Sequence, residues 1–349
     1  MKKKNDGVIS STFCVSKSIE KSSYVLIILF FFTSFFLSCD EMNERVLPNC
    51  TGKAGDLLIV ADSAIYNHQT GEALKNIFAQ EQVGLTAREP LFNVIQVPHR
   101  SFARIFHTTR NIIMVKIEPN QKTKLTVTKD VWANAQLLIT ITAPSNEKAA
   151  LTITKNADAL LDYFNDKEIE RLQAKYSLNK NSKRAQEVEE QLGLRINIDE
   201  LYIVAEKAKD FMWLRKEKDV GGHPVSQGII IYTYPYVSDS TFEVKELVKK
   251  RNYYTKKYVK GGAKGSYMAS YKEYTPNQKE VSLNGVYLNE LRGLWHMEND
   301  FMGGAYVNYS MVDEKNNRVI CLDGYVYCPK FDKREYLREQ EALIKTITF

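Results

Sequence analysis

The spacing of apolar positions predicts which segments of the chain are strands and which are helices. Short β-branched and aromatic runs bounded by turn residues predict strands, and apolar residues three or four apart predict helices. In the first half, strands are expected at 56–62, 91–97, 111–117 and 135–143, and helices at 70–80 and 148–193. Because strands and helices do not alternate strictly, the pattern favours an α+β fold over a doubly wound sheet.

The second half shows a similar order of predicted elements. Its strands are expected at 194–198, 228–236, 265–274, 279–288, 306–312 and 319–329, and its helices at 241–258 and 333–347. Both halves contain two strands joined through a short polar segment, and both end in strand, proline, spacer and helix. We interpret this as two similar α+β halves with mainly antiparallel sheets and packed helices, related by a degenerate internal duplication. The alternative is that α+β chains often share such patterns without duplication.

The apolar run Tyr24–Leu37 predicts a secretory signal. Its 14 residues are fewer than the roughly 20 that a membrane-spanning helix needs, and five lysines precede it. It ends in Phe36-Leu37-Ser38-Cys39, which resembles the lipobox of bacterial lipoproteins, in which the cysteine is acylated and becomes the first mature residue. The alternative is an ordinary signal or a short membrane helix that happens to end in cysteine.

These features predict four segments. Residues 1–38 are the lipoprotein signal peptide, 39–54 a polar tether, 55–193 the first α+β half and 194–349 the second. We expect a lipid-anchored protein of the outer membrane, on the periplasmic face by default. The acidic pair Asp40-Glu41 behind the anchor leaves display at the cell surface open.

The charge of the chain argues against nucleic acid as a partner. The formal net charge is +6, of which the leader carries +3 through five lysines against Asp6 and Glu20. The remaining +3 is too mild for the concentrated basic face of a nucleic-acid binder. The membrane, reached through Cys39, and an envelope protein are the expected partners.

Five cysteines are present, and three of them remain after the leader and the anchor are removed. These are Cys50, Cys321 and Cys328. The segment around Asp323-Gly324 reads either as a hairpin or as one continuous strand, and we favour the strand. A disulfide between Cys321 and Cys328 remains an alternative.

The densest candidate binding segment is 291–310, "LRGLWHMENDFMGGAYVNYS". Arg292 would clamp a carboxylate or phosphate, Trp295 would offer an aromatic platform, and Gly303-Gly304 would allow close backbone approach. His296, Glu298 and Asp300 lie between them. The alternative is a strand-to-strand connection with a glycine turn and a core tryptophan.

Other motifs add little chemistry. No catalytic signature, metal-binding pattern or cofactor motif is found, so we expect no catalytic residue, metal or cofactor. Ser63 in Asp-Ser-Ala and Ser240 in Asp-Ser-Thr match short O-glycosylation patterns. The tyrosine-rich segments 228–236 and 285–291 are candidates for a contact face.

Several segments together resemble DUF4837, a family of Bacteroidetes lipoproteins of unknown function. They are the lipobox, "RNIIMVKI" at 110–117, "GIIIYTYPY" at 228–236, "LRGLWHMENDFMGGAY" at 291–306 and "GYVYCPKFDKREYLREQEALI" at 324–344. The resemblance covers nearly the whole mature chain. It implies a lipoprotein, and it implies no activity and no site residues.

The expected function is a non-enzymatic, envelope-anchored binding or assembly protein. The alternative is a periplasmic or surface hydrolase acting on envelope glycan or peptide. That alternative requires His296, Glu298 and Asp300 to converge with Arg292 in a cleft. A small-ligand binder with a cleft between the two halves lies between these expectations.

Overall fold

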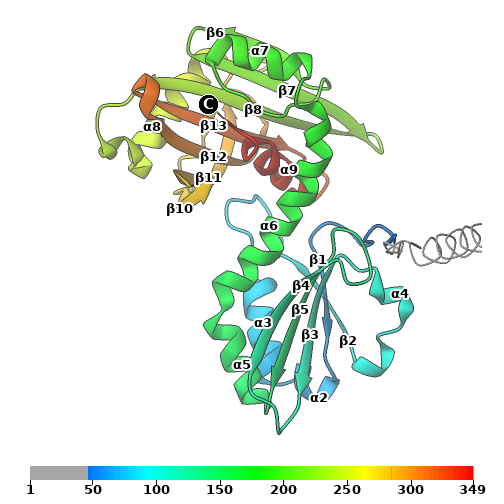
Figure 1. Ribbon diagram of the computed structural model, residues 1–349. Coiled ribbons are helices and arrows are strands. Elements are labelled where there is room, and N and C mark those ends of the chain that lie inside the picture. The colour runs from blue at the N-terminus through cyan, green and yellow to red at the C-terminus, as the bar shows by residue number, and fades with distance from the viewer. Residues whose placement is uncertain (1–45, 284, 349) are drawn as a thin grey trace, which may run out of the picture. The chain divides into compact units, whose positions relative to one another are not determined.

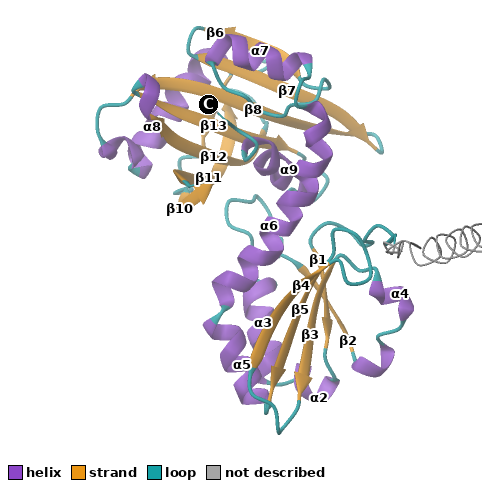
Figure 2. Cartoon of the chain, viewed as in Figure 1, coloured by secondary structure: helices purple, strands orange, loops and turns teal. Residues whose placement is uncertain are grey.

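The computed structural model describes residues 46–283 and 285–348 (Figure 1). The predicted signal peptide and the predicted lipidation residue Cys39 lie outside these residues. Strands and helices segregate around two separate sheets, one in each half of the described chain (Figure 2). The α+β class and the two-part architecture are confirmed.

The first sheet has five strands in the order β2-β1-β3-β5-β4. Four of them run parallel, and β4 pairs antiparallel with β5 at one edge. The strands are β1 (Asp56–Val60), β2 (Asn93–Val97), β3 (Asn111–Ile117), β4 (Lys124–Lys129) and β5 (Leu137–Ala143). The near-continuous apolar runs of β1, β3 and β5 suit parallel strands that are buried on both faces.

Helices cover one face of this sheet. The helices of the first half are α2 (Ser63–Tyr66), α3 (Gln69–Phe78), α4 (Arg104–His107), α5 (Asn146–Lys155) and α6 (Ala157–Tyr176). Helices α3, α5 and α6 pack on one face, where the rings of Phe78, Phe92 and Phe164 meet edge to face at 5.6–6.1 Å. Within the described residues, the opposite face is covered by loops, by the 3-10 turn η1 (His99–Ser101) and by the single turn of α4.

The second sheet has eight strands, all paired antiparallel. Its order is β10-β11-β12-β13-β8-β7-β6, with β9 paired to β11. The strands are β6 (Ile203–Ala208), β7 (Phe211–Val220), β8 (His223–Pro235), β9 (Tyr267–Ser270), β10 (Asn277–Leu283), β11 (Val286–Glu298), β12 (Gly303–Asp313) and β13 (Arg318–Tyr327). The segment 318–327 is therefore one continuous strand, as the sequence predicts.

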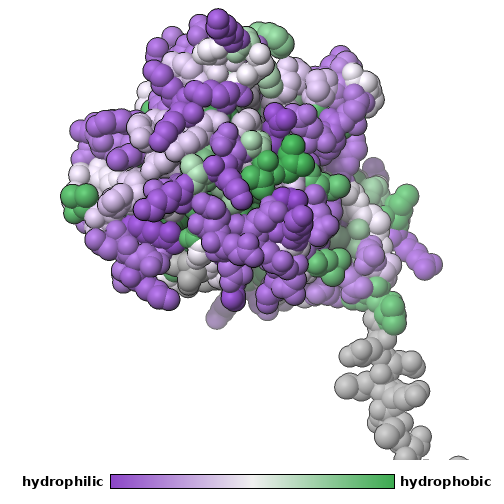
Figure 3. Space-filling model, turned by 90° about the horizontal axis from the view of Figure 1, so that it is seen from above, coloured by the Kyte–Doolittle hydropathy of each residue, from purple (hydrophilic) through white to green (hydrophobic). Residues whose placement is uncertain are grey.

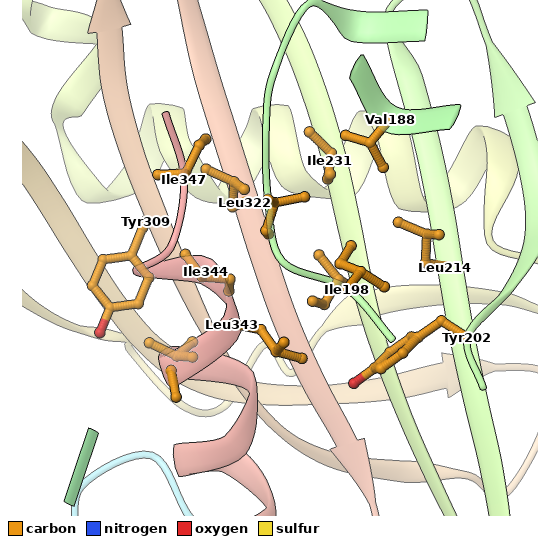
Figure 4. Packing of buried hydrophobic residues seen from close by; sticks show 14 of the residues in the cluster. Val188, Ile198, Tyr202, Leu214, Ile231, Tyr309, Leu322, Leu343, Ile344 and Ile347 are labelled. Atoms are coloured by element: carbon orange, nitrogen blue, oxygen red, sulfur yellow. The ribbon is translucent and has the colours of Figure 1, made fainter. Parts of the chain in front are cut away.

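Both faces of the second sheet are buried. Helices α7 (Lys183–Leu192) and α9 (Arg334–Ile344) pack on one face, where Val188, Leu322 and Leu343 share a core (Figure 4). Helix α8 (Val244–Tyr258) packs on the other. Three short 3-10 turns complete the half, η2 (Ser177–Asn179), η3 (Asp239–Phe242) and η4 (Glu314–Asn316).

The internal duplication predicted from the sequence is wrong. The first sheet is mostly parallel with a strand order of 2-1-3-5-4, whereas the second is wholly antiparallel, so the halves are not copies of one unit. Short strand patterns do not specify pairing direction, which depends on the connections. The expected boundary at residue 193 also lies one helix late, because Val188 and Leu192 of α7 belong to the second core.

Two expected elements differ in detail. The segment 194–198 is extended and its Leu194, Ile196 and Ile198 are buried, but it forms only one isolated bridge, between Arg195 and Thr348. The helix expected from residue 241 begins at Val244, after the 3-10 turn η3, with Glu243 at its N-cap. The segment 279–288, expected as one strand, spans the hairpin of β10 and β11, and the strands β4 and β7 and most of β11 were not expected from the sequence.

A buried carboxylate joins the loop before β2 to the last helix. Glu89 is 4% exposed and accepts hydrogen bonds from the backbone N–H of Lys333 and Arg334, at 2.8 Å for the shortest contact of each. The first N–H groups of a helix lack partners within the helix, so a carboxylate there stabilises the start of α9.

A fully buried ion pair fastens α8 to the second sheet. Arg251 donates from Nε to Asp323 Oδ2 at 2.8 Å and from Nη2 to Oδ1 at 3.1 Å, and both residues are 0% exposed. Arg251 also donates to Ser270 Oγ at 3.2 Å, and its guanidinium lies 3.8 Å from the ring centroid of Tyr306. The bidentate geometry and the extra contacts offset the cost of removing both charges from water.

We predict that Arg251→Met destabilises the fold by about 3–5 kcal/mol, because Asp323 is left buried without a cation. The double variant Arg251→Met, Asp323→Leu should lose less unfolding free energy than the single variant, since no uncompensated charge remains. Urea unfolding followed by tryptophan fluorescence measures both. Arg88→Met is the control: its side chain is 89% exposed beside Glu81, and we expect a change below about 0.5 kcal/mol. A loss below about 1 kcal/mol for Arg251→Met would contradict the prediction.

Candidate functional site

The predicted binding segment forms the hairpin of β11 and β12. Side chains of a strand alternate between its faces, and Arg292 and Trp295 stand three positions apart, so they lie on opposite faces of the sheet. Arg292 contacts Glu341 of α9 on one face, and Trp295 packs with Tyr325 in the core beneath α8 on the other. The structure does not bring these two residues together.

Trp295 has a structural environment. It is 2% exposed, its Nε1 donates to the carbonyl oxygen of Val326 at 3.3 Å, and its ring lies edge-on to Tyr325 at 5.4 Å. The two glycines serve the same packing. A β-carbon at Gly304 would lie 2.0 Å from the carbonyl oxygen of Val326, and one at Gly303 would lie 2.9 Å from that of Trp295. Glycine is therefore required by the neighbouring backbone.

Arg292 lies in a buried ionic network. Its guanidinium bonds Glu290 Oε1 at 2.6 Å and Glu341 Oε2 at 2.7 Å, and Tyr309 donates its hydroxyl to Glu290 Oε2 at 2.7 Å. Burial alone would raise the pKa of Glu290, but the charge of Arg292 and the hydrogen bonds from Arg292 and Tyr309 lower it to about 2. Since its carboxylate partners already occupy it, Arg292 is not open to a ligand.

His296 and its acidic neighbours lie at the far end of the hairpin. His296 Nε2 is 3.3 Å from Glu298 Oε1, and its Nδ1 is buried without a hydrogen-bond partner among the described residues. Asp300 accepts from the backbone N–H of Phe301 at 2.7 Å. None of the three contacts the Arg292 network in the described chain, so the convergence that the hydrolase alternative requires is not present there.

The remaining candidates are placed as follows. Ser63, the first residue of α2, and Ser240, in η3, are both exposed, and their glycosylation stays a prediction. Cys50, Cys321 and Cys328 are free thiols. Burial raises the pKa of the Cys321 thiol to about 11, which keeps it protonated and unreactive at neutral pH.

A groove of about 1300 Å³ lies elsewhere on the second half. It is bounded by η3, by the hairpin of β10 and β11, and by the end of β12 with η4. Its principal polar and aromatic lining residues are Tyr236, Asp239, Phe242, Glu243, Gln278, Glu280, Tyr287, Asn289, Asp313, Glu314, Lys315 and Asn317. We call this the acidic groove.

The charge of the acidic groove is opposite to that of the whole chain. Five lining residues are acidic and one, Lys315, is basic, although the chain carries a net charge of +6. Tyr236 donates its hydroxyl to Asp239 Oδ1 at 2.6 Å, which raises the pKa of the tyrosine. Tyr287 is 50% exposed, so its ring is accessible from solvent. The groove therefore offers aromatic surface beside negative charge.

The tyrosines of the two tyrosine-rich segments lie in different environments. Tyr287, in 285–291, reaches the acidic groove, whereas Tyr232 and Tyr234, in 228–236, are buried and only Tyr236 lines it. The face seen in Figure 3 is mainly hydrophilic, with apolar residues in small groups. In the described chain no group of three or more His, Cys, Asp or Glu is arranged to hold a metal ion.

Fold and groove define a class: a two-part α+β protein whose antiparallel half carries an open acidic groove. Residues 181–346 match the family described as "Domain of unknown function (DUF4837)", and this part of the chain belongs to that family. Residues 50–177 match a second one, "Domain of unknown function (DUF8532)". The DUF4837 resemblance is thus confirmed for the second half, while 110–117 falls in the segment that matches DUF8532.

Other comparisons add no function. No curated protein matches the chain. A mutant of protein Mog1 and the Ran-binding protein Mog1p of Saccharomyces cerevisiae align with a TM-score of 0.26, at 10% and 11% identity. Each alignment covers 44% of this chain and 89% of the other, and carries no argument at that TM-score. Among the described residues, none of the helices has the length and apolar character needed to cross a bilayer.

We predict that acid weakens the fold through Glu290. Its folded pKa, about 2, is below the unfolded value of about 4.3, so its stabilisation is complete above about pH 4.3 and is lost as the pH falls toward 2. Unfolding free energy measured against pH should fall less steeply in this window for Glu290→Gln than for the natural chain. Parallel curves for the two proteins would refute this role. Glu314→Gln, at an exposed position, is the control and should follow the natural curve.

Proposed function

We propose that this chain is a lipid-anchored protein of the outer membrane that binds a basic polypeptide segment of an envelope partner, without catalysis. The observation that carries the proposal is the acidic groove, which combines accessible aromatic rings with an excess of carboxylates. Lysine and arginine side chains combine an apolar stem with a cationic head, and such a groove suits both parts.

The carboxylates of the groove are available to a cation in different degrees. Asp313 is committed to Arg318 at 2.8 Å and to Asn316. Glu280 and Glu314 are exposed, and neither has an ion-pair partner among the described residues. These two side chains are therefore the ones that we expect to attract a basic ligand and to accelerate its association.

The edge of the sheet next to the groove favours an extended ligand. Strand β10 is the last in the order and pairs on one side only, with β11, within the described chain. Gln278 and Glu280 of β10 line the groove. A free strand edge can accept an added strand from a partner, and polar side chains on the adjacent face then select its sequence.

The predicted lipid anchor is the basis for the proposed cellular location of the protein. A lipobox-like Cys39 after a short apolar run supports a location at the outer membrane, on the periplasmic side by default. Membrane proteins and exported chains of the envelope are the partners that such a position makes accessible.

The anchor itself can be tested separately. We expect the natural chain, produced in cells with radiolabelled palmitate, to incorporate label and to fractionate with the outer membrane. Cys39→Ser should lose the label and leave that fraction, because no thiol remains at the lipobox position. Cys50→Ser is the matched control, and equal labelling of the natural chain and Cys39→Ser would refute the anchor.

The groove can be tested by photocrosslinking. We expect a photoreactive phenylalanine at position 287 to form a defined adduct with a partner in the native envelope. The same residue at position 253 is the control, because Tyr253 is a tyrosine of similar exposure on α8, 58% against 50%. Glu280→Lys with Glu314→Lys should reduce the adduct at least about 5-fold, since two attractive charges become repulsive. An equal yield from positions 287 and 253, or an adduct unaffected by the charge reversal, would rule the groove out.

A further inference from the structure

The point at which the chain enters its first sheet is fixed by backbone hydrogen bonds. The N–H of Cys50 donates to Asn134 O at 3.2 Å, and that of Thr51 donates to Thr108 O at 2.7 Å. In return, the N–H of Arg110 donates to Thr51 O at 3.0 Å and that of Asn134 to Pro48 O at 2.8 Å. Residues 48–51 are therefore held between the segment that follows α4 and the loop before β5.

An aromatic and apolar surface adjoins this entry point. It consists of Phe102, Ile105, Phe106, His107 and Trp132, which we call the anchor-side face. The rings of His107 and Trp132 stack at 4.8 Å, and Phe102 lies 5.7 Å from Trp132. The other four side chains are partly exposed, while Ile105 is 78% exposed at the surface.

Hydrogen bonds from a buried amide side chain hold this face together with the entry point. Gln136 Nε2 donates to His107 O at 2.6 Å and to Thr109 O at 2.7 Å, and its Oε1 accepts from the N–H of Trp132 at 3.0 Å. Gln136 itself is 0% exposed. The turn of α4 and the tryptophan loop are therefore one structure, and residues 48–51 are bonded to it.

The face also carries positive charge. Arg100 and Arg104 are exposed beside it, and neither forms an ion pair in the described part of the chain. Aromatic and aliphatic groups flanked by arginine are typical of a protein surface that rests in the headgroup region of a bilayer. Arginine adds attraction to anionic lipid there.

The tether is too short to hold this face far from a membrane. From Cys39 to Leu47 there are eight residue steps, which span at most about 29 Å when fully extended. A domain of about 130 residues has a radius of gyration near 14 Å, so it is about as wide as the tether is long. The side of the first half that carries residues 48–51 is thus the side that the anchor draws toward the lipid.

We propose that the anchor-side face rests on the lipid bilayer, with Ile105 and Trp132 in the interfacial region and Arg100 and Arg104 among anionic headgroups. This inference rests on the proposed lipidation of Cys39. It fixes an orientation: the first half lies against the membrane on the face that carries η1 and α4, and the layer of α3, α5 and α6 points away from it.

The test places an environment-sensitive fluorescent amino acid at position 105 of the full-length lipidated protein. The matched control is position 151, because Leu151 is an apolar residue, 47% exposed, on α5 of the opposite face. Both proteins are reconstituted into vesicles of phosphatidylethanolamine and phosphatidylglycerol. We expect a blue shift at 105 and at least a 2-fold quenching by brominated lipid, with no change at 151.

Charge reversal gives a second readout on the same protein. Arg100→Glu with Arg104→Glu should reduce the quenching at position 105, while vesicle flotation of the lipidated chain remains unchanged. An unchanged melting temperature of each variant shows that the fold is retained.

The outcomes separate the anchor from the face. If the protein floats with the vesicles but positions 105 and 151 respond alike, or neither responds, the orientation is refuted and the anchor stands. If the natural chain does not float, both the anchor and the membrane contact are refuted.

Discussion

Two consecutive residues of β13 hold the second sheet between its helical layers. Asp323 points toward α8 and receives both nitrogens of the buried Arg251 guanidinium. Gly324 points the other way, and a β-carbon there would lie 2.6 Å from Cβ of Gln340 in α9. One strand thus supplies an ionic contact on one face and a close backbone approach on the other. Because β13 is central, both layers depend on its register with β12 and β8.

This arrangement explains why the charged residues of the candidate segment serve the fold. Arg292 bonds Glu290 within β11 and Glu341 of α9, so it joins β11 to the helix that packs closely over Gly324. Glu89 then bonds the first N–H groups of that same helix. Buried charges of this kind are stable only when every partner is present. They fix α9 from both ends and leave no free charge for a ligand.

The sequence predicts the elements far better than their assembly. Alternation and helical spacing locate most strands and helices, and Asp323-Gly324 is correctly assigned to a strand, because those signals are local. Pairing direction is not local, so the two halves looked like copies. The strand β11 was not expected over 291–298, and taking that segment as a strand would have placed Arg292 and Trp295 on opposite faces, because side chains alternate along a strand. The acidic groove could not be predicted from the sequence. Its walls come from four segments that only the pairing of β10, β11 and β12 brings together.

The contrast between buried and exposed charge separates structure from recognition in this chain. In the second half, the buried carboxylates Glu290 and Asp323 each face an arginine, whereas the exposed Glu280 and Glu314 face solvent across the acidic groove. Asp313 of the groove is buried and paired with Arg318, but an exposed charge contributes little to folding, so stability gives no reason for Glu280 and Glu314 to lie there. On the first half the unusual surface residue is apolar: Ile105 of α4 is 78% exposed. We propose a different neighbour for each surface: a basic polypeptide for the acidic groove and lipid for the anchor-side face, whose Phe102, Phe106 and Trp132 also pack on the core beneath them.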